Sequence, residues 1–201
     1  ICPVEIPQRK GDPIVVDQDE FIRPSTTLEK LSTLRTVFKK DGTVTAGNAS
    51  GLNDGAAAML VVSEDALKKY NLTPKARIVS SAVVGVEPRI MGIGPVYATK
   101  KALLKAGLEL GDMDVMEFNE AFSSQALACT RELGLADDDP RINPNGGAIA
   151  IGHPLGMSGT RIIQAATNQL IRSGGRYALA TMCVGVGMGY AIIIENVKDR
   201  K

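Results

Sequence analysis

The sequence predicts an α/β fold, a layered domain in which helices cover a mixed sheet. Two observations carry this prediction. Strand-like and helical segments alternate from residue 77 onward, which is the order typical of layered α/β domains. The last two strand-like runs follow one another without a helix between them, which predicts a hairpin at one side of the sheet. With 44% apolar and 22% charged residues, the 201-residue chain has the composition of a globular protein.

The beginning of the chain carries few periodic signals. Residues 1–26 are rich in Pro, Asp and Arg and predict an irregular loop. Thr26 and Glu29 have the spacing of a capping box, which predicts a short helix with leucines on its apolar face. Residues 45–51 are all small, so the backbone there can approach another group closely.

A strand and a helix are predicted before the regular part of the chain. Residues 57–62 are apolar and predict a buried strand. Ser63 then provides an N-cap for a helix that runs to about Tyr70. The segment Asn71-Leu72-Thr73-Pro74 follows and is the candidate domain boundary.

The remaining elements are bounded by clear local signals. Pro95 suits the first turn of a helix, and Gly107 suits the position just beyond its end. Gly134 stops a second helix, and the Gly-rich loop 145–156 leads into a third. The predicted strands are 77–86, 115–118, 177–183 and 190–194, and the other two predicted helices are 120–133 and 158–172.

Composition excludes several classes of function. A net charge of +1, 4% aromatic residues and no Trp argue against a nucleic-acid partner. No apolar run approaches the roughly 18 residues that a membrane span needs, and no signal peptide is expected. Three cysteines without CxxC spacing and one histidine predict a cytoplasmic protein with no metal site. The chain does not begin with Met, so its true start is left open.

One candidate general base stands out. His153 is the only histidine, and Gly152 and Pro154 fix the backbone around it. Histidine is the commonest general base, but it is equally often a polar residue whose hydrogen bonds are satisfied within a turn. The residue alone does not distinguish these two interpretations.

Two further candidates lie where strands end. Cys183 ends an apolar strand and enters a Gly-rich run, where backbone N–H groups could stabilise an oxyanion, although most free cysteines are buried hydrophobes. Asn119 follows another strand and either caps the next helix or acts as a donor near a reacting carbonyl. Cys129 is expected in the core, and Cys2 is given no role.

Four stretches taken together resemble the thiolase family in sequence and order. These stretches are T-V-T-A-G-N-A-S-G-L-N-D-G-A-A-A from Thr43, N-E-A-F from Asn119, N-P-N-G-G-A-I-A-I-G-H-P-L-G-M-S-G-T-R from Asn143, and C-V-G-V-G-M-G from Cys183. The resemblance covers nearly the whole chain. It implies a thiolase-like layered domain and an acyltransferase that uses coenzyme A as a substrate and binds no cofactor tightly.

The resemblance also assigns roles to residues. It implies that His153 activates a nucleophilic cysteine, that Cys183 moves a proton to and from the substrate α-carbon, and that Asn119 holds a water in an oxyanion hole. The backbone of Gly185 would contribute to a second oxyanion hole. The residues implied to line the path of coenzyme A and the acyl group are Ala46, Ser50, Ala121, Phe122 and Met91.

The nucleophilic cysteine of the family precedes all four stretches and is absent here. By resemblance, residues 1–52 are the end of a loop domain, residues 53–73 close the N-terminal domain, and residues 74–201 form a complete C-terminal domain. The chain therefore looks like a fragment that needs the missing N-terminal half, and alone it is expected to be inactive. The family implies a homodimer or homotetramer that acts on acyl-CoA and coenzyme A.

Local sequence narrows the resemblance to thiolases of 3-oxoadipyl-CoA. Val186 stands where many thiolases have glycine, and it is one of the features that carry this narrower likeness. An acetoacetyl-CoA thiolase is the alternative. Arg89 and Arg141 are candidates for holding the distal carboxylate of a dicarboxylic acyl chain. Two alternatives from other functional classes remain open. One is a non-catalytic CoA-binding module, and the other is a structural or dimerisation fragment.

Overall fold

The core of the protein is a four-stranded mixed sheet. The computed structural model describes residues 2–197. Strands β3 (Ala76–Gly85), β4 (Met113–Phe118), β5 (Tyr177–Val184) and β6 (Met188–Asn196) lie in the order β3-β6-β5-β4. The β4–β5 pair is parallel and the other two pairs are antiparallel. The prediction of an α/β fold with a mixed sheet covered by helices is confirmed.

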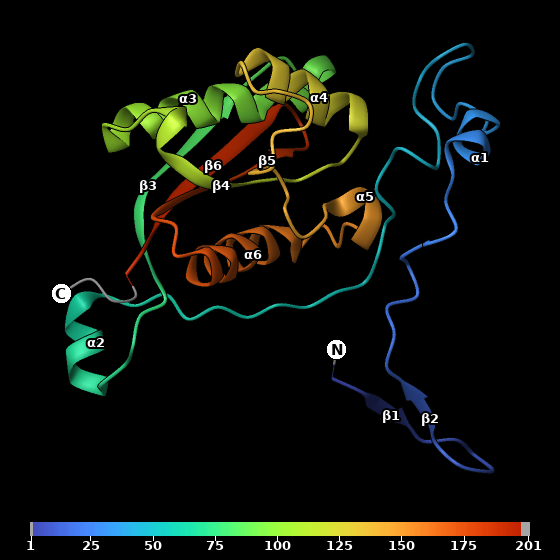
Figure 1. Ribbon diagram of the computed structural model, residues 1–201, viewed down its shortest axis with the longest axis horizontal. Helices are drawn as coiled ribbons and strands as arrows, with labels where there is room; N and C mark the ends of the chain where they lie inside the picture. Colours follow the sequence, from blue (N-terminus) through green and yellow to red (C-terminus); the bar gives the residue numbers. More distant parts are fainter. Residues whose placement is uncertain (1, 198–201) are drawn as a thin grey trace.

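Helices cover both faces of this sheet (Figure 1). Helices α3 (Gly94–Ala106) and α4 (Ser123–Glu132) lie on one face, and α6 (Ser158–Ser173) lies on the other. Side chains alternate along β4, so Met116 and Phe118 pack toward α3 and α4 while Val115 packs toward α6. Each face therefore has its own apolar core.

The β5–β6 hairpin occupies the middle of the sheet, and its predicted place at one side is wrong. Strand β6 pairs with β3 as well as with β5. Residues 191–194 read Ala-Ile-Ile-Ile and are all buried, as expected for a strand covered on both faces. An uninterrupted apolar run was therefore the signal for a central strand.

Local signals set some helix ends correctly. Pro95 lies in the first turn of α3, and Gly107 ends it in the left-handed conformation at φ +65°. Helix α4 begins at Ser123, three residues later than predicted, because Phe122 is extended and serves as its N-cap. Asn119 therefore does not cap this helix. The predicted loop 145–156 also contains a short helix, α5 (Ala148–Ile151).

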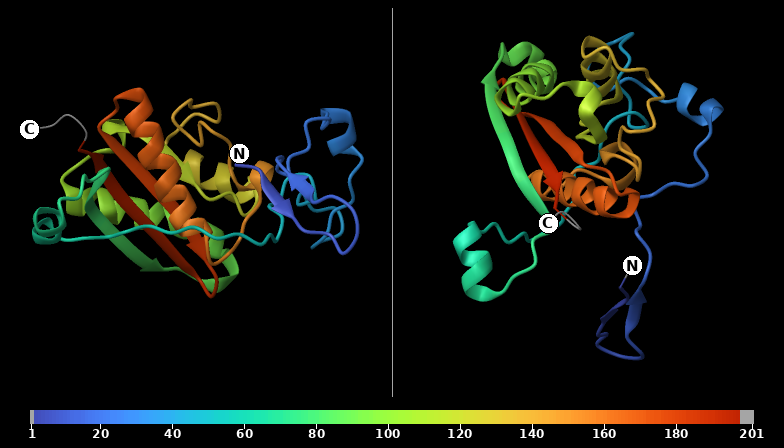
Figure 2. Two further views of the ribbon diagram at one scale, coloured as in Figure 1. Left: turned by 90° about the horizontal axis from the view of Figure 1, so that it is seen from below. Right: turned by 60° about the vertical axis from the view of Figure 1, so that its left-hand side comes forward.

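The first 75 residues lie mostly outside the layers (Figures 1 and 2). A hairpin of β1 (Val4–Ile6) and β2 (Ile14–Val16) replaces the predicted irregular loop. Helix α1 (Leu28–Ser32) is capped by Thr27, so the predicted capping box at Thr26 is one residue out of place. Helix α2 (Glu64–Tyr70) is capped by Ser63 as predicted. Two 3₁₀ segments, η1 (Pro88–Ile93) and η2 (Leu110–Asp112), complete the elements.

Residues 57–62 do not form the predicted buried strand. They belong to no strand, and Leu60 and Val61 are 75% and 69% exposed. The residues are apolar enough for a strand, but no strand in the described part of the chain pairs with them. Burial of such a segment requires a sheet that these residues themselves do not provide. Within residues 2–197, no helix has the length and apolar character needed to cross a membrane.

Candidate active site

The candidate site lies at the carboxyl ends of β4 and β5. Asn119 directly follows β4, and its backbone N–H donates to the carbonyl of Thr181 on β5 at 3.0 Å. Cys183 comes two residues after Thr181 on the same strand. Because β4 and β5 are parallel, both polar groups reach the same edge of the sheet, where ligands of α/β proteins commonly bind.

The backbone of His153 is held between α5 and α6 by the segment 51–53. Its N–H is shared by the carbonyl of Gly51 at 3.1 Å and the side-chain oxygen of Asn53 at 3.2 Å. Gly152 has φ +89°, and a Cβ on it would lie 2.4 Å from that same oxygen. Glycine at this position is therefore required both by conformation and by space.

Hydrogen bonds define the tautomer of the His153 ring. Ser158 donates its only hydroxyl proton to the carbonyl of Pro154 at 3.0 Å, so it accepts from Nδ1 of His153 at 2.6 Å. The proton is thereby placed on Nδ1 and the lone pair on Nε2. The side-chain nitrogen of Asn119 donates to this Nε2 at 3.2 Å. Nε2 is therefore the basic atom of the ring, and it faces the side chain of Asn119.

Burial keeps the His153 ring neutral. The side chain is 7% exposed, and removal from water lowers the pKa of His153, with the positive charge of Arg161 lowering it further. A neutral imidazole can accept a proton, whereas an imidazolium cannot. The geometry and the direction of the pKa both suit a general base at neutral pH.

Replacing Ser158 by alanine in the full-length protein is expected to lower kcat/KM by roughly 10-fold to 100-fold, the effect of losing one buried hydrogen bond to a reacting group. The buried Nδ1–H of His153 would lose its acceptor, so the ring could rotate or change tautomer. Ser173→Ala, at the exposed end of the same helix, is the matched control. A folded Ser158→Ala protein with unchanged kcat/KM would show that the serine does not hold the ring.

Cys183 is a protonated thiol beside a tight turn. It is 7% exposed, and burial raises the pKa of its thiol. The turn between β5 and β6 contains Gly185. A Cβ added to this glycine would meet no other atom within 4 Å, so the space beside it is open. Val186 follows at φ +62° and is 83% exposed. A β-branched residue rarely adopts this left-handed conformation, so the turn next to the thiol is strained.

The residues assigned to the coenzyme A path are brought together only in part. The N–H of Ser50 donates to the carbonyl of Ala121 at 3.0 Å, and Ala49 bridges to Phe122. Ala46 is exposed in a neighbouring turn, and Met91 belongs to η1, which packs against α4. Ser50, Ala121 and Phe122 thus share one strip beside the end of β4.

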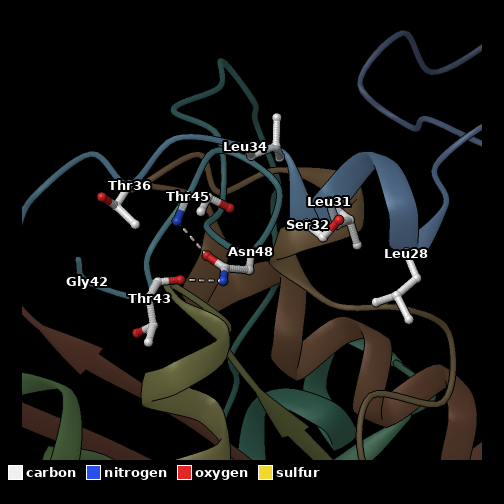
Figure 3. A pocket seen from close by; sticks show the side chains of 9 residues that line it. All are labelled: Leu28, Leu31, Ser32, Leu34, Thr36, Gly42, Thr43, Thr45 and Asn48. Carbon is white, nitrogen blue, oxygen red and sulfur yellow. Dashed lines mark hydrogen bonds between the residues drawn. The ribbon is translucent and has the colours of Figure 1, made fainter. Parts of the chain in front are cut away.

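The small residues of 45–51 serve packing within this chain. A Cβ on Gly47 would lie 2.4 Å from Leu31 and 2.6 Å from Leu34. Figure 3 shows these leucines beside a cavity, whose volume is about 490 Å³. The side chain of Asn48 forms hydrogen bonds there with the backbone of Thr45 and of Thr43. His153, Cys183 and Asn119 do not line this cavity.

Reasoning from the sequence missed the partners that orient His153. Ser158 was taken only as the start of a helix, and Asn53 only as part of the stretch that begins at Thr43. A hydroxyl five residues after a single histidine was the available signal.

An α/β fold with a neutral imidazole and a protonated thiol at one edge of its sheet is typical of enzymes that move protons. Comparison with known proteins also indicates an enzyme of this kind. Residues 72–196 match the family described as "Thiolase, C-terminal domain", and residues 1–65 match "Thiolase, N-terminal domain". The chain belongs to the thiolase family of acyltransferases.

Individual relatives are similar along nearly all of this chain. A beta-ketoadipyl-CoA thiolase of Acinetobacter baylyi is 62% identical over 197 residues, which are 98% of this chain and 49% of that protein. The crystal structure of human mitochondrial 3-ketoacyl-CoA thiolase has a TM-score of 0.90 at 54% identity and covers 97% of this chain and 48% of that one. Its complex with CoA has a TM-score of 0.89 at 53% identity, with the same coverage. The chain spans about half the length of the curated relatives it matches.

Proposed function

We propose that this chain supplies the acid/base half of a thiolase that cleaves or forms 3-oxoacyl-CoA. The observation that carries the proposal is the neutral His153, with Nδ1 anchored on Ser158 and Nε2 facing Asn119. A CoA-binding module that performs no chemistry has no need of a base held in one tautomer. A nucleophilic cysteine from the remainder of the protein completes the site.

Each proton in this proposal has a donor and an acceptor. In thiolysis, Nε2 of His153 takes the proton of the nucleophilic thiol, and the resulting thiolate attacks the 3-oxo carbon of the substrate. The bond between C2 and C3 breaks, and the thiol of Cys183 donates its proton to C2, which leaves as acetyl-CoA. Free coenzyme A then gives its thiol proton to Cys183, and its thiolate attacks the acyl-enzyme. The acyl group leaves as the new acyl-CoA, and the released cysteine thiolate takes back its proton from Nε2 of His153. The covalent intermediate divides one difficult step into two easier ones.

Stabilisation of negative oxygen is assigned to the groups already described. Once protonated, Nε2 of His153 becomes a donor, and with a water held by Asn119 it can stabilise one developing oxyanion. The N–H of Gly185 would serve the second oxyanion, beside the thiol of Cys183. Ala46, Ser50, Ala121 and Phe122 would follow the pantetheine arm, and Met91 would lie at the acyl pocket. Coenzyme A enters as a substrate, and no tightly bound cofactor is required.

The division into domains is part of the proposal. Residues 1–52 would be the end of the loop domain, 53–73 the closing segment of the N-terminal domain, and 74–201 the C-terminal domain. The family matches over 1–65 and 72–196 support the boundary between the N-terminal and C-terminal domains. The exposed apolar residues of 57–62 support the assignment of 53–73, since they would pair within a sheet of the missing half. We further infer a cytoplasmic homodimer or homotetramer.

The proposed substrate is 3-oxoadipyl-CoA, cleaved to succinyl-CoA and acetyl-CoA. The support is the name of the Acinetobacter baylyi relative. A dicarboxylic chain needs a cation for its free end. Arg141 is committed to Asp139 and to the carbonyl of Met113, at the opposite end of β4 from Asn119. Arg89 is exposed, pairs only with Glu87 among the described residues and lies two residues from Met91, so it is the better candidate.

Steady-state thiolysis by the full-length protein tests both levels of the proposal. We expect a kcat/KM at least about 10-fold higher for 3-oxoadipyl-CoA than for acetoacetyl-CoA, because one charge-assisted pair with the distal carboxylate is worth roughly that much. Residues 1–201 alone, as a control, should show no turnover. Preference for acetoacetyl-CoA would overturn the substrate, and CoA binding without turnover of either compound would overturn the thiolase reaction.

A further inference from the structure

A short stretch of chain continues the sheet beyond β4, which is the last strand in the sheet order. The backbone N–H of Met116 donates to the carbonyl of Arg141, and the N–H of Asn143 donates to the carbonyl of Met116, both at 2.8 Å. Met116 and Ile142 form a parallel bridge between the two segments. Backbone hydrogen bonds of this kind support the outer edge of β4 as far as Met116.

The side chain of Asn143 takes over where this backbone pairing ends. Asn143 has the left-handed φ of +44°, and its carbonyl accepts from the N–H of Gly146 at 2.9 Å in the turn that follows. Its carboxamide replaces the backbone partner that Phe118 would otherwise lack. Oδ1 accepts the N–H of Phe118 at 2.8 Å, and Nδ2 donates to the carbonyl of Phe118 at 2.9 Å. The side chain therefore holds the residue directly before Asn119.

Glu120 connects Asn143 to the loop that carries the histidine. The other hydrogen on Nδ2 of Asn143 is donated to Oε1 of Glu120 at 2.7 Å, and Oε2 accepts the N–H of Ile149 in α5 at 3.2 Å. The buried Gly147 lies against this carboxyl group, and a Cβ there would overlap the carboxyl carbon. Both oxygens accept hydrogen bonds, which a carboxylate can do and a carboxamide, with its single acceptor oxygen, cannot.

These contacts act on both sides of Asn119. Its two neighbours in the chain, Phe118 and Glu120, are both bonded to Asn143, and Glu120 also reaches α5, which ends just before His153. Nδ2 of Asn119 lies 3.2 Å from Nε2 of His153. Oδ1 of Asn119 is buried and has no hydrogen-bond partner among residues 2–197. The place of this side chain therefore depends on how firmly its backbone is held.

We propose that Asn143 and Glu120 are positioning residues that set the place of Asn119 relative to Nε2 of His153. The inference rests on the proposed thiolase function, in which His153 and a water held by Asn119 stabilise an oxyanion. Asn143 and Glu120 touch no reacting atom in this account and act through Asn119. A displacement of about 1 Å at a reacting group can cost roughly 100-fold in rate, so these hydrogen bonds matter for turnover.

Glu120→Gln in the full-length protein tests the first of these residues, because it keeps the shape of the side chain and turns one acceptor into a donor. It must lose the hydrogen bond from Asn143 or the one from Ile149, so kcat for thiolysis should fall by roughly 10-fold to 100-fold. KM for coenzyme A should change less than about threefold, as expected when a transition-state contact alone is lost. The matched control is Glu132→Gln, at the exposed end of α4. A kcat equal to that of the control, or a loss that appears in KM alone, would overturn the proposal.

Asn143→Asp tests the second residue. It keeps an acceptor for the N–H of Phe118, but it removes both hydrogens of Nδ2 and places a second carboxyl group beside Glu120. The fall in kcat should be at least as large as in Glu120→Gln. Asn145→Asp changes an exposed asparagine of the same loop, which bonds to Gln169, and should leave kcat unchanged. Equal kcat values in the two asparagine variants would contradict the role of Asn143.

Crystal structures of the full-length wild type and of Glu120→Gln test the positioning without any turnover. The distance between Nδ2 of Asn119 and Nε2 of His153 should stay near 3.2 Å in the wild type and increase by at least about 0.5 Å in the variant. An unchanged distance would overturn the proposal even if activity falls. If the wild-type protein shows no thiolysis, the proposed function fails separately, and this distance still decides whether Glu120 positions Asn119.

Discussion

Replacing His153 by alanine in the full-length protein is expected to reduce kcat/KM for thiolysis by about 10³-fold to 10⁴-fold, the range for loss of a general base that also activates a nucleophile. The ring is the only imidazole in this chain, it is buried, and its Nε2 is free of a proton. Alanine removes both the acceptor for the thiol proton and the donor for the oxyanion. Initial rates at saturating coenzyme A measure the effect.

The pH dependence gives an independent signature of the same residue. Burial lowers the pKa of His153 below its usual value near 6.5. The base is therefore neutral above the lowered pKa, and the rate should fall only when pH drops through that value. Retained CoA binding and an unchanged unfolding temperature would establish that His153→Ala is folded. A folded variant that keeps more than about a tenth of the wild-type kcat/KM would remove His153 from the reaction.

Replacing Cys183 by alanine is expected to lower the rate of thiolysis by about 10³-fold while leaving transfer of an acetyl group from acetyl-CoA to the enzyme detectable. The thiol is buried and its raised pKa keeps the proton on sulfur at neutral pH, as a proton donor to the α-carbon requires. Alanine has no proton to give, but the nucleophile and His153 remain. Radiolabelled acetyl-CoA measures the acyl transfer.

Cys129 provides a matched control for this substitution. It is also a buried thiol, 0% exposed on α4, and burial raises its pKa to about 11. Its Sγ donates to the carbonyl of Gly92, so it serves the core. Cys129→Ala should change kcat less than about threefold. Equal losses in the two variants would mean that Cys183 acts through packing and moves no proton.

The sequence predicted the ends of helices best where a single local signal sets the position of the end. Pro95 and Gly107 bound α3, and Ser63 caps α2, because ring geometry, left-handed φ and a side-chain oxygen act within one turn. The start of α4 was mispredicted because the side chain of Asn119 forms a hydrogen bond with His153, 34 residues away in the chain, and does not cap the helix. The partner of a side chain in the folded protein overrides its local preference.

Long-range pairing explains the other differences. The central position of the β5–β6 hairpin depends on β3, which precedes it by about 100 residues, and no turn signal reports such a pairing. Residues 57–62 have strand character but nothing in residues 2–197 to pair with. His153, Asn119 and Cys183 were found from their motifs, whereas Ser158 required the three-dimensional arrangement.

Exchange of the α-hydrogens of acetyl-CoA in deuterated water tests the central claim most directly, because it isolates the proton transfer assigned to this chain. Mass spectrometry would follow deuterium entering the acetyl group in the presence of the full-length protein. The account predicts exchange with the wild type and with Cys129→Ala, and none above background with Cys183→Ala. Exchange at the wild-type rate in Cys183→Ala, or no exchange by a wild-type protein that binds coenzyme A, would contradict it.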